Sequence, residues 1–248
     1  MQQYFIKGRA EKIVQLTDKD TIKHMFQVMR LTDKEELVLV FEDGIKRLAR
    51  VSDSSAYEVE LIKELEENVE MPVEVTIASG FPKGDKLDVI TQKTTELGAA
   101  AIWGFPADWS VVKWDSKKLA KKQEKLAKIA LGAAEQSKRN RVPEIQLFDQ
   151  KGELLKQLKQ FDKCFIAYEE AAKAGERSTL ARELAGLSPG QKVLFIFGPE
   201  GGISPKELAG FKQAGAITVG LGPRIMRTET APLYALSAVS YALELMSS

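Results

Sequence analysis

From residue 73 onward, segments typical of buried β-strands alternate along the chain with segments typical of amphipathic helices. We expect strands at 73–78, 99–103, 164–168, 192–197 and 216–221, and helices at 85–97, 117–137 and 231–246. A further helix should begin after Ser204, a good N-cap, because Pro205 suits the first helical position and Glu207 completes a capping box. Adjacent parallel strands need a long, usually helical, crossover. The alternation therefore predicts an α/β domain with a mainly parallel sheet.

The first 70 residues have a different, β-rich character. Strands are expected at 36–42, 45–51 and 57–62, and a short helix at 24–31. Asp43-Gly44 is typical of a tight turn, so the first two strands should form a hairpin. The acidic segment 63–72 then ends in proline. We place a domain boundary near residue 70, which gives a domain 1–70 and a domain 71–248.

The rare residue types argue against several kinds of site. The chain has one cysteine, Cys164, and one histidine, His24, so it has no internal disulfide and no cysteine-cluster metal site. A zinc site built on histidines needs at least two, and a Ser-His-Asp triad would depend on His24 alone. No Gly-x-Ser-x-Gly segment accompanies it. Most hydrolase chemistry is therefore disfavoured, and Cys164 is interpreted as a small core residue of a strand.

The hydropathy and the charge distribution of the chain bear on its cellular location and on the partners it can bind. The apolar run 193–197 is far too short to span a bilayer, and the N-terminus lacks the pattern of a secretory signal, so we expect a cytoplasmic protein. The net charge is only +1. Lysine and arginine are nevertheless concentrated between Lys113 and Arg141. This basic block either faces phosphates or is the solvated face of a helix.

Two glycine-rich loops each follow a buried strand, at 197–204 and at 221–231. Ligands of open α/β sheets bind beyond the carboxyl ends of the strands, and glycines let the backbone approach a ligand closely. The first loop also leads into a capped helix N-terminus, which favours negative charge or acceptor groups. The alternative is that the glycines only make turns. The segment 80–86 loosely echoes a phosphate-binding loop, but its spacing is wrong.

With these loops, the chain resembles the RsmE family of 16S ribosomal RNA uridine-N3 methyltransferases, in the SPOUT superfamily. The strongest matches are GPEGG at 198–202 and LGPRIMRTETA at 221–231. Supporting matches are His24 with 28–30, Lys93 with 96–98, and 135–137 with Arg139, Arg141 and Pro143. The resemblance covers essentially the whole chain.

The resemblance implies a fold and a cofactor. Domain 1–70 would be a small PUA-like β-barrel that helps to bind RNA, and domain 71–248 a SPOUT methyltransferase domain with a trefoil knot. A homodimer would complete each site. The knotted loops would hold S-adenosylmethionine, with Ile225 and Met226 as walls for the adenine. The residues implied to bind the cofactor are Gly198, Glu200, Gly201, Gly202, Leu221, Gly222, Ile225, Met226 and Arg227.

The implied reaction makes its own demand on the site. N3 of uracil carries a proton, so the enzyme must remove that proton or stabilise the uracil anion. Arginines suit this task, and a sulfonium methyl donor needs no metal. Our catalytic candidates are Arg224 and Arg227, with Arg139 and Arg141 reaching across a dimer interface. Glu229 is a candidate base or a structural anchor, for instance as a cap of the last helix.

The implied partner is 16S ribosomal RNA in the small subunit. Candidate RNA-binding residues are His24, Arg30, Lys117, Lys118, Lys121 and Lys122. His24 alternatively packs within the N-terminal domain. Two rival functions stay open: a SPOUT methyltransferase with a different RNA target, and a non-catalytic RNA-binding module in ribosome assembly.

The chain departs from the family pattern at three positions. Family members often have arginine near position 3, where this chain has Gln3, and arginine before Ser110, where it has Trp109. Both departures could weaken phosphate contacts, or Trp109 could stack on a base. Met226 replaces a usual leucine, which is a mild change.

Overall fold

The computed structural model describes residues 1–168 and 179–246 and divides into two compact units. The first unit comprises Met1–Glu70 together with Ala134–Val142, and the second comprises Met71–Ala133 and the described part of Pro143–Ser248. No helix in the described ranges is both long and apolar enough to cross a membrane.

The first unit is built on a five-stranded sheet with the order β1-β3-β4-β5-β2. The strands are β1 (Gln3–Phe5), β2 (Ile13–Gln15), β3 (Glu36–Val40), β4 (Lys46–Asp53) and β5 (Glu58–Leu65). The predicted hairpin is confirmed, because β3 and β4 pair antiparallel and Gly44 in the turn has a φ of 71°. The two short strands β1 and β2 were not predicted, since three residues carry no readable alternation.

The helical segment of the first unit begins earlier than the sequence predicted. Helix α1 (Lys19–Ile22) starts at Asp18, whose carboxylate accepts a hydrogen bond from the main-chain N–H of Thr21 at 2.7 Å. It continues as the π-helix η1 (Lys23–Val28), which buries Met25 completely. The prediction of 24–31 missed the Asp18 cap, a local signal that was present in the sequence.

The second unit contains a six-stranded sheet with the order β11-β9-β10-β6-β7-β8, in which every pair of neighbours is parallel. The predicted mainly parallel sheet is therefore confirmed. The strands are β6 (Glu74–Gly80), β7 (Ala101–Phe105), β8 (Glu144–Leu147), β9 (Lys163–Ala167), β10 (Lys192–Phe197) and β11 (Ile217–Val219). Strand β8 was not predicted. The trefoil knot stays a prediction.

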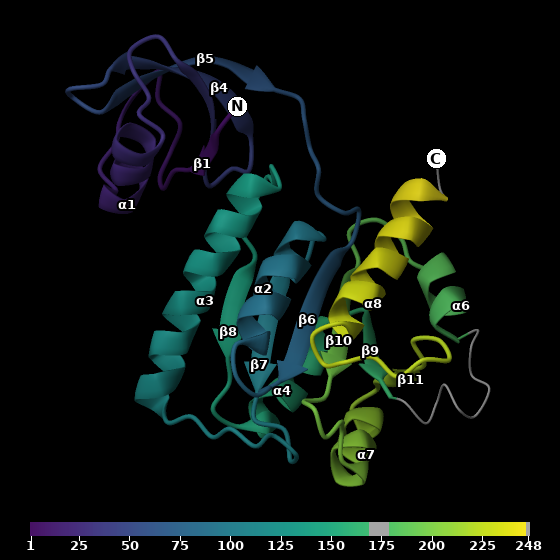
Figure 1. Ribbon diagram of the computed structural model, residues 1–248. Coiled ribbons are helices and arrows are strands. Elements are labelled where there is room, and N and C mark those ends of the chain that lie inside the picture. The colour runs from purple at the N-terminus through teal and green to yellow at the C-terminus, as the bar shows by residue number, and fades with distance from the viewer. Residues whose placement is uncertain (169–178, 247–248) are drawn as a thin grey trace. The chain divides into compact units, whose positions relative to one another are not determined.

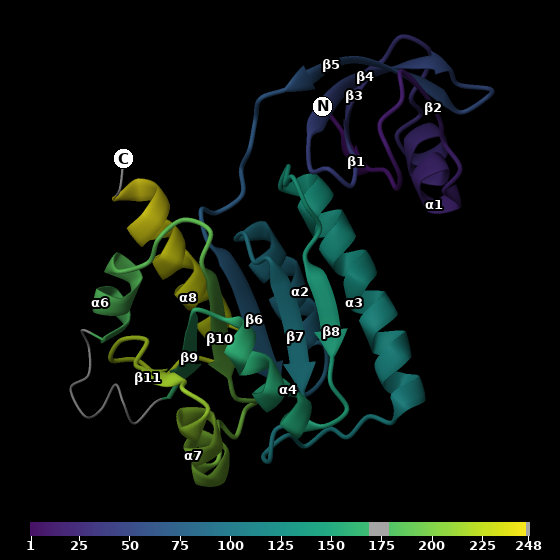
Figure 2. The ribbon, with the colours of Figure 1, turned by 180° about the vertical axis from the view of Figure 1, so that it is seen from behind.

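Helices cover both faces of this sheet (Figures 1 and 2). Helices α2 (Lys86–Glu96) and α8 (Ala231–Ser240) pack together on one face, and α8 continues as the π-helix η3 (Tyr241–Leu245). Helices α4 (Lys151–Gln157), extended by the turn η2 (Leu158–Gln160), and α7 (Pro205–Gln213) lie on the other. Helix α3 (Ser116–Gln136) and helix α6 (Thr179–Ala185) complete the described helices. Helices α4 and α6 were not predicted.

The parallel sheet determines where the loops meet. All its strands point the same way, so the loops after β7, β9, β10 and β11 leave from one edge. Strands β10 and β11 precede the two glycine-rich loops, but they are not neighbours, because β9 lies between them. The end of β9 is thereby placed between the two loops, which the sequence analysis did not anticipate.

Candidate functional site

The first glycine-rich loop folds back tightly on itself. It follows β10, whose residues Val193–Phe197 are all buried. The main-chain N–H of Gly202 donates to the carbonyl of Pro199 at 2.8 Å, and Gly202 has a φ of 81°. A Cβ atom added at Gly198 would lie 2.4 Å from the carbonyl carbon of Gly202. Only glycine fits at position 198, and the close turn exposes main-chain groups toward the neighbouring space.

The helix after this loop begins as the sequence predicted. Ser204 is the N-cap of α7, and its hydroxyl accepts a hydrogen bond from the main-chain N–H of Glu207 at 3.1 Å. The carboxylate of Glu207 in turn accepts a hydrogen bond from the main-chain N–H of Ser204 at 3.0 Å. Pro205 occupies the first turn. The predicted capping box is confirmed.

The second loop runs from Leu221 to Thr230 and is tied to the first. Gly222 has a φ of 89°, in the left-handed region that favours glycine. A turn closes where the main-chain N–H of Thr230 donates to the carbonyl of Arg227 at 2.9 Å. The hydroxyl of Thr228 donates to the carbonyl of Gly198 at 3.3 Å. This hydrogen bond holds the two loops together although they are separated in sequence.

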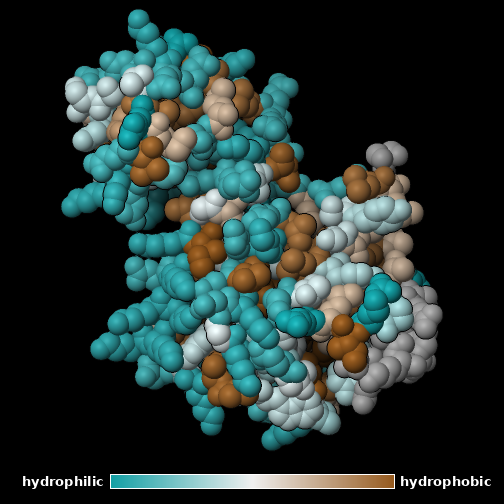
Figure 3. Space-filling model, in the orientation of Figure 1, coloured by the Kyte–Doolittle hydropathy of each residue, from teal (hydrophilic) through white to brown (hydrophobic). Residues whose placement is uncertain are grey.

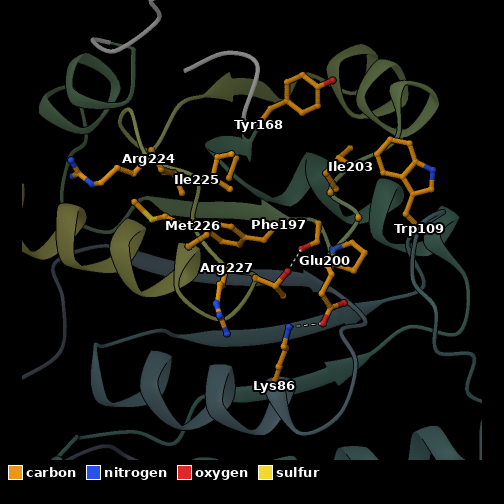
Figure 4. A pocket seen from close by; sticks show the side chains of 18 of the residues that line it. Lys86, Trp109, Tyr168, Phe197, Glu200, Ile203, Arg224, Ile225, Met226 and Arg227 are labelled. Atoms are coloured by element: carbon orange, nitrogen blue, oxygen red, sulfur yellow. Dashed lines mark hydrogen bonds and ion pairs between the residues drawn. The ribbon is translucent and has the colours of Figure 1, made fainter. Parts of the chain in front are cut away.

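The two loops enclose one pocket of about 750 Å³, shown in Figure 4. All nine residues predicted to bind a cofactor line it, and so does Arg224. The sequence analysis did not name Lys86, Ala167 or Tyr168, which also line it. A volume of this size suits a ligand of the size of a nucleoside derivative. Ile225 lines the pocket and is 76% exposed. Covering this apolar side chain with a ligand would be favourable, because apolar surface would be removed from water.

Lys86 joins carboxylates from both loops. Its Nζ lies 2.8 Å from Oε1 of Glu200 and 3.6 Å from Oε2 of Glu229. The main-chain N–H of Lys83 also donates to Glu200, at 3.1 Å. Burial raises the pKa of Glu200, but the hydrogen bond from Lys86 and main-chain donors outweigh it, so this pKa is lowered. The pKa of Lys86 is raised, chiefly by the hydrogen bond to Glu200.

Glu229 does not line the pocket. Its Oε2 atom is buried and has no hydrogen bond, since Lys86 stands just beyond hydrogen-bond distance. Thr230 rather than Glu229 is the N-cap of α8, and it makes no capping hydrogen bond through its side chain. The structure thus puts Glu229 against Lys86.

The two arginines of the second loop are both exposed but point in different directions. In Figure 4 the side chain of Arg224 points away from the other labelled residues, whereas Arg227 extends toward the side on which Lys86 lies. Within the described part of the chain, neither guanidinium has an ion-pair partner among the salt bridges. Both arginines are therefore available to a ligand.

Two residues that line the pocket had weak signals in the sequence. Tyr168 directly follows β9, so it occupies the carboxyl end of a strand that the sequence analysis recognised. Lys86 is the first residue of α2 and the last residue of the glycine-containing segment 80–86, whose spacing does not fit a phosphate-binding loop. The position of β9 between β10 and β11 is what brings Tyr168 to the pocket, and the sequence does not reveal this strand order.

The remaining catalytic candidates, Arg139 and Arg141, lie in the first unit against Glu70. Arg139 is 2% exposed, and its Nε donates to Oε1 of Glu70 at 3.1 Å. Arg141 donates to Oε2 of Glu70 at 3.1 Å, and the main-chain N–H of Asn140 donates to Oε1 at 2.9 Å. Burial raises the pKa of Glu70, but Arg139, Asn140 and Arg141 together lower it. The predicted action of these arginines across a dimer interface stays a prediction.

Gln3 belongs to the same part of the first unit. Its side chain is 3% exposed and donates to the carbonyl of Arg139 at 2.7 Å. At this position the chain therefore uses the glutamine for an internal contact.

The RNA-binding candidates are divided between the two units. In the first, His24 and Arg30 are exposed, and His24 Nδ1 shares a hydrogen bond of 3.0 Å with the hydroxyl of Tyr4. In the second, Lys117, Lys118 and Lys121 are exposed on α3 and Lys122 is half-buried. Figure 3 shows hydrophilic side chains projecting along the side of the second unit where α3 lies in Figure 1.

Potential metal ligands are dispersed over residues 1–168 and 179–246. No cluster of three or more histidine, cysteine, aspartate or glutamate side chains in those ranges could hold a metal ion. The single cysteine, Cys164, is buried in β9, and burial raises the pKa of its thiol to about 11.

Comparison with protein families gives two matches. Residues 69–240 match the family described as "RNA methyltransferase domain", and residues 16–64 match the one described as "RNA methyltransferase PUA domain". The first match covers more than half of the chain. The second falls on the curled sheet of the first unit, which supports the predicted PUA-like domain.

Individual relatives match over nearly the full length. The "Ribosomal RNA small subunit methyltransferase E" of Bacillus subtilis is 44% identical over 253 residues, covering 99% of this chain and 98% of its own. The protein of the same name from Mycobacterium tuberculosis is 32% identical, covering 91% of this chain and 86% of its own. A crystal structure of a ribosomal RNA small subunit methyltransferase E from Neisseria gonorrhoeae, bound to S-adenosyl methionine, is 29% identical with a TM-score of 0.82, and the match covers 97% of each chain.

Proposed function

The chain belongs to the family of ribosomal RNA small subunit methyltransferases E, and we propose that it transfers a methyl group from S-adenosylmethionine to N3 of a uridine in 16S ribosomal RNA. The observation that carries this proposal is the shared pocket of the two glycine-rich loops, held together by the bond from Thr228 to the carbonyl of Gly198. The choice of uridine N3 as the methylated atom rests on the resemblance of the sequence to the family, whereas the pocket supports the binding of the cofactor.

The pocket residues fit a nucleoside-containing cofactor. Gly198 and Gly201 stand where a side chain would collide with neighbouring atoms, so the backbone of the first loop can approach a ligand closely. Ile225 and Met226 offer apolar surface for an adenine, and main-chain groups of Leu221 can supply its polar partners. When bound, S-adenosylmethionine supplies an electrophilic methyl group that needs no metal.

The chain's own residues must prepare the uracil. The proton on N3 has to leave, and the resulting negative charge spreads over N3 and the two neighbouring carbonyl oxygens of the base. Arg227 extends into the region beside Lys86, where its guanidinium can stabilise that charge. Glu200 is paired with Lys86 and Glu229 rests against the same lysine, which supports an anchoring role for Glu229.

A homodimer is part of the proposal. Exposed apolar side chains gather at the C-terminal end of the chain on α8 and η3: Tyr234, Tyr241, Leu245 and Met246. A patch of this kind is more stable when it is covered. Sedimentation of the purified protein tests this point, with a dimer mass expected and a monomer at micromolar concentration contradicting it.

The proposed substrate is the small ribosomal subunit, which places the enzyme in the cytoplasm. The exposed lysines of α3 then serve to contact phosphates. Replacing Lys117, Lys118, Lys121 and Lys122 by glutamine should weaken RNA binding and flatten its dependence on salt. Unchanged affinity and unchanged salt dependence would mean that this face of α3 is merely solvated.

Two measurements test the function itself. Calorimetry with S-adenosylhomocysteine should give micromolar or tighter binding, and no binding would favour a non-catalytic RNA-binding module. Methylation of purified small subunits, followed by mass spectrometry of the nucleosides, should yield 3-methyluridine. Transfer to another RNA, or to another position, would favour a methyltransferase with a different target.

A further inference from the structure

A loop outside the two glycine-rich segments presents an indole ring at the pocket. It runs over residues 106–115, directly after β7, and contains Trp109 and Trp114. Trp109 is 47% exposed and lines the pocket. A Cβ atom added at Gly201 would lie 2.8 Å from the Cβ of Trp109, so the base of the tryptophan rests directly on the first glycine-rich loop.

The backbone that carries Trp109 is firmly anchored. The neighbouring Asp108 accepts a hydrogen bond from the hydroxyl of Ser204 at 2.6 Å and pairs with Lys151. The main-chain N–H of Asp108 donates to Oε1 of Glu207 at 2.8 Å, and Glu207 is itself 5% exposed. These bonds connect the loop to the capping box of α7. The indole is therefore held at the pocket in advance of binding, which reduces the entropy cost of contacting a ligand.

The position of Trp109 relative to the proposed cofactor walls favours a contact with the substrate. In Figure 4, Trp109 stands beside Ile203 on the opposite side of the pocket from Arg224, Ile225 and Met226. The adenine is proposed to lie against Ile225 and Met226. The Trp109 side is then the one that is left for the approaching nucleobase.

The same loop carries a second aromatic ring, Trp114, which has a basic group beside it. The ring of Trp114 packs on Phe81 with 4.4 Å between centroids, and Nζ of Lys122 lies 5.6 Å from the centre of the Trp114 ring. The exposed lysines at the start of α3 follow directly in sequence. Aromatic rings among lysines are typical of surfaces that bind single-stranded nucleic acid, because bases stack on the rings and the lysines neutralise phosphates.

From these observations we infer that Trp109 is a stacking platform for the RNA base that enters the pocket, and that Trp114 and the lysines of α3 hold the single strand leading to it. This inference rests on the proposed function and names how that function selects its substrate. The ligand is an unpaired nucleobase within RNA. Stacking accepts any base, so Trp109 positions the base while other groups choose it.

The test compares three replacements of Trp109 in the full-length protein, assayed for methyl transfer to purified small subunits. Trp109→Ala and Trp109→Leu should raise the KM for the subunits by about 5- to 100-fold, the range that corresponds to the loss of one stacked base. Trp109→Phe keeps a flat ring and should stay within about threefold of the original protein. Val111→Ala is the matched control, because Val111 is 66% exposed on the same loop and does not line the pocket.

Several outcomes would overturn the inference. One is a Trp109→Ala enzyme whose KM for subunits equals that of Val111→Ala. Another is a Trp109→Leu enzyme that behaves like the original, since apolar packing would then suffice. A third is a rise in the Kd for S-adenosylhomocysteine as large as the rise in KM for RNA, which would assign Trp109 to the cofactor.

A binding measurement keeps the inference separate from the proposed function. Titration with a ten-residue oligouridine should quench the tryptophan fluorescence of the original protein more than that of Trp109→Phe, since Trp103 is buried and Trp114 is half-buried. Equal quenching in the two proteins would contradict stacking at Trp109. If the original protein transferred no methyl group but showed this difference, the proposed function would fail and the stacking site would stand.

Discussion

The pocket and the Glu70 cluster, which consists of Glu70, Arg139 and Arg141, both combine acidic with basic side chains, but they use them in opposite ways. At the Glu70 cluster, Arg139 is 2% exposed and fully engaged by a carboxylate that is itself largely buried. At the pocket, Arg227 is exposed and its guanidinium makes no ion pair among the described salt bridges. In the first arrangement both arginines are paired with a carboxylate of the same chain, whereas in the second the guanidinium of Arg227 can pair with a ligand.

Structural and functional arginines differ here in their pairing with carboxylates of the same chain. The sequence analysis grouped Arg139 and Arg141 with Arg224 and Arg227, because all four lie in segments that match the family. Pairing divides them: Arg139 and Arg141 are paired with Glu70, and breaking the buried pair of Arg139 should destabilise the fold. An exposed, unpaired guanidinium at a pocket is instead suited to binding or catalysis. Mutations at the two places should therefore affect different measurements.

The largest expected effect is on stability, from Glu70→Gln. This change keeps the shape of the side chain but leaves Arg139 buried without its counter-charge, which costs about 3–5 kcal/mol. Urea unfolding followed by circular dichroism measures it. Glu36→Gln is the control, because its pair with Arg50 is largely exposed and should be worth at most about 1 kcal/mol. Equal losses in the free energy of unfolding from Glu70→Gln and Glu36→Gln would mean that the buried pair is worth no more than the exposed one.

The pH dependence of the Glu70 cluster adds a second readout to this prediction. Because the folded-state pKa of Glu70 is lowered, its contribution is fully present above the unfolded-state pKa and is lost as the pH falls through the folded-state pKa. The stability difference between the original protein and Glu70→Gln should therefore shrink in acid. A difference that is constant from neutral pH into acid would contradict a charged pair.

The next effect is on activity, from Arg227→Ala. Removing a group that stabilises developing negative charge should lower kcat about 100- to 1000-fold. The free energy of unfolding should change by less than about 0.5 kcal/mol, because the side chain is exposed. Single-turnover methyl transfer and urea unfolding on the same preparation measure both. An unchanged rate would mean that Arg227 takes no part in methyl transfer, and it would contradict the functional role assigned to an unpaired arginine at the pocket.

The features that the sequence predicted well share one property: their signals are local. The strand β10, the hairpin at Gly44 and the capping box at Ser204 are each specified by residues a few positions apart. The two glycine-rich loops were recognised for the same reason.

Several of the features that were missed depend on contacts between distant segments, whereas the Asp18 cap is a local signal that was overlooked. Glu70 and Arg139 are 69 positions apart, and Lys86 and Glu200 are 114 apart. No periodicity in the sequence reveals that β9 inserts between β10 and β11 and brings Tyr168 to the pocket. The short strands β1 and β2 form because longer neighbours pair with them, not because of their own residues.

A smaller effect is expected from Lys86→Met, which tests the paired charges of the pocket. The ion pair with Glu200 is partly exposed, so its loss should lower kcat/KM by at most about fivefold. Without Lys86 the pKa of Glu200 should rise, since Lys86 helps to lower it against the effect of burial. The acidic limb of the pH profile of kcat/KM should then move to higher pH.

Lys86→Arg is the matched variant for this experiment. It keeps the positive charge and should restore most of the activity and the original acidic limb. A loss of activity in Lys86→Met without any movement of the pH profile would mean that Lys86 acts only in packing. A loss as large as that from Arg227→Ala would place Lys86 in direct contact with the reacting groups.

A further effect on stability is expected within the first unit, at Glu135. Unlike Glu70, this carboxyl forms no ion pair with an arginine in the described part of the chain. Burial raises its pKa to about 7, although a hydrogen bond from the main chain of Phe5 and the charge of Lys138 oppose the rise. The folded state therefore holds a proton that the unfolded state releases at lower pH, so stability falls as the pH rises from about 4.5 through 7. Glu135→Gln should stabilise the protein at pH 8.5 by on the order of 1–2 kcal/mol, and this gain should vanish below the unfolded-state pKa. Urea unfolding at pH 4 and pH 8.5 measures the gain at each pH. A gain of the same size at both would show that Glu135 does not titrate in this range, which would contradict the raised pKa.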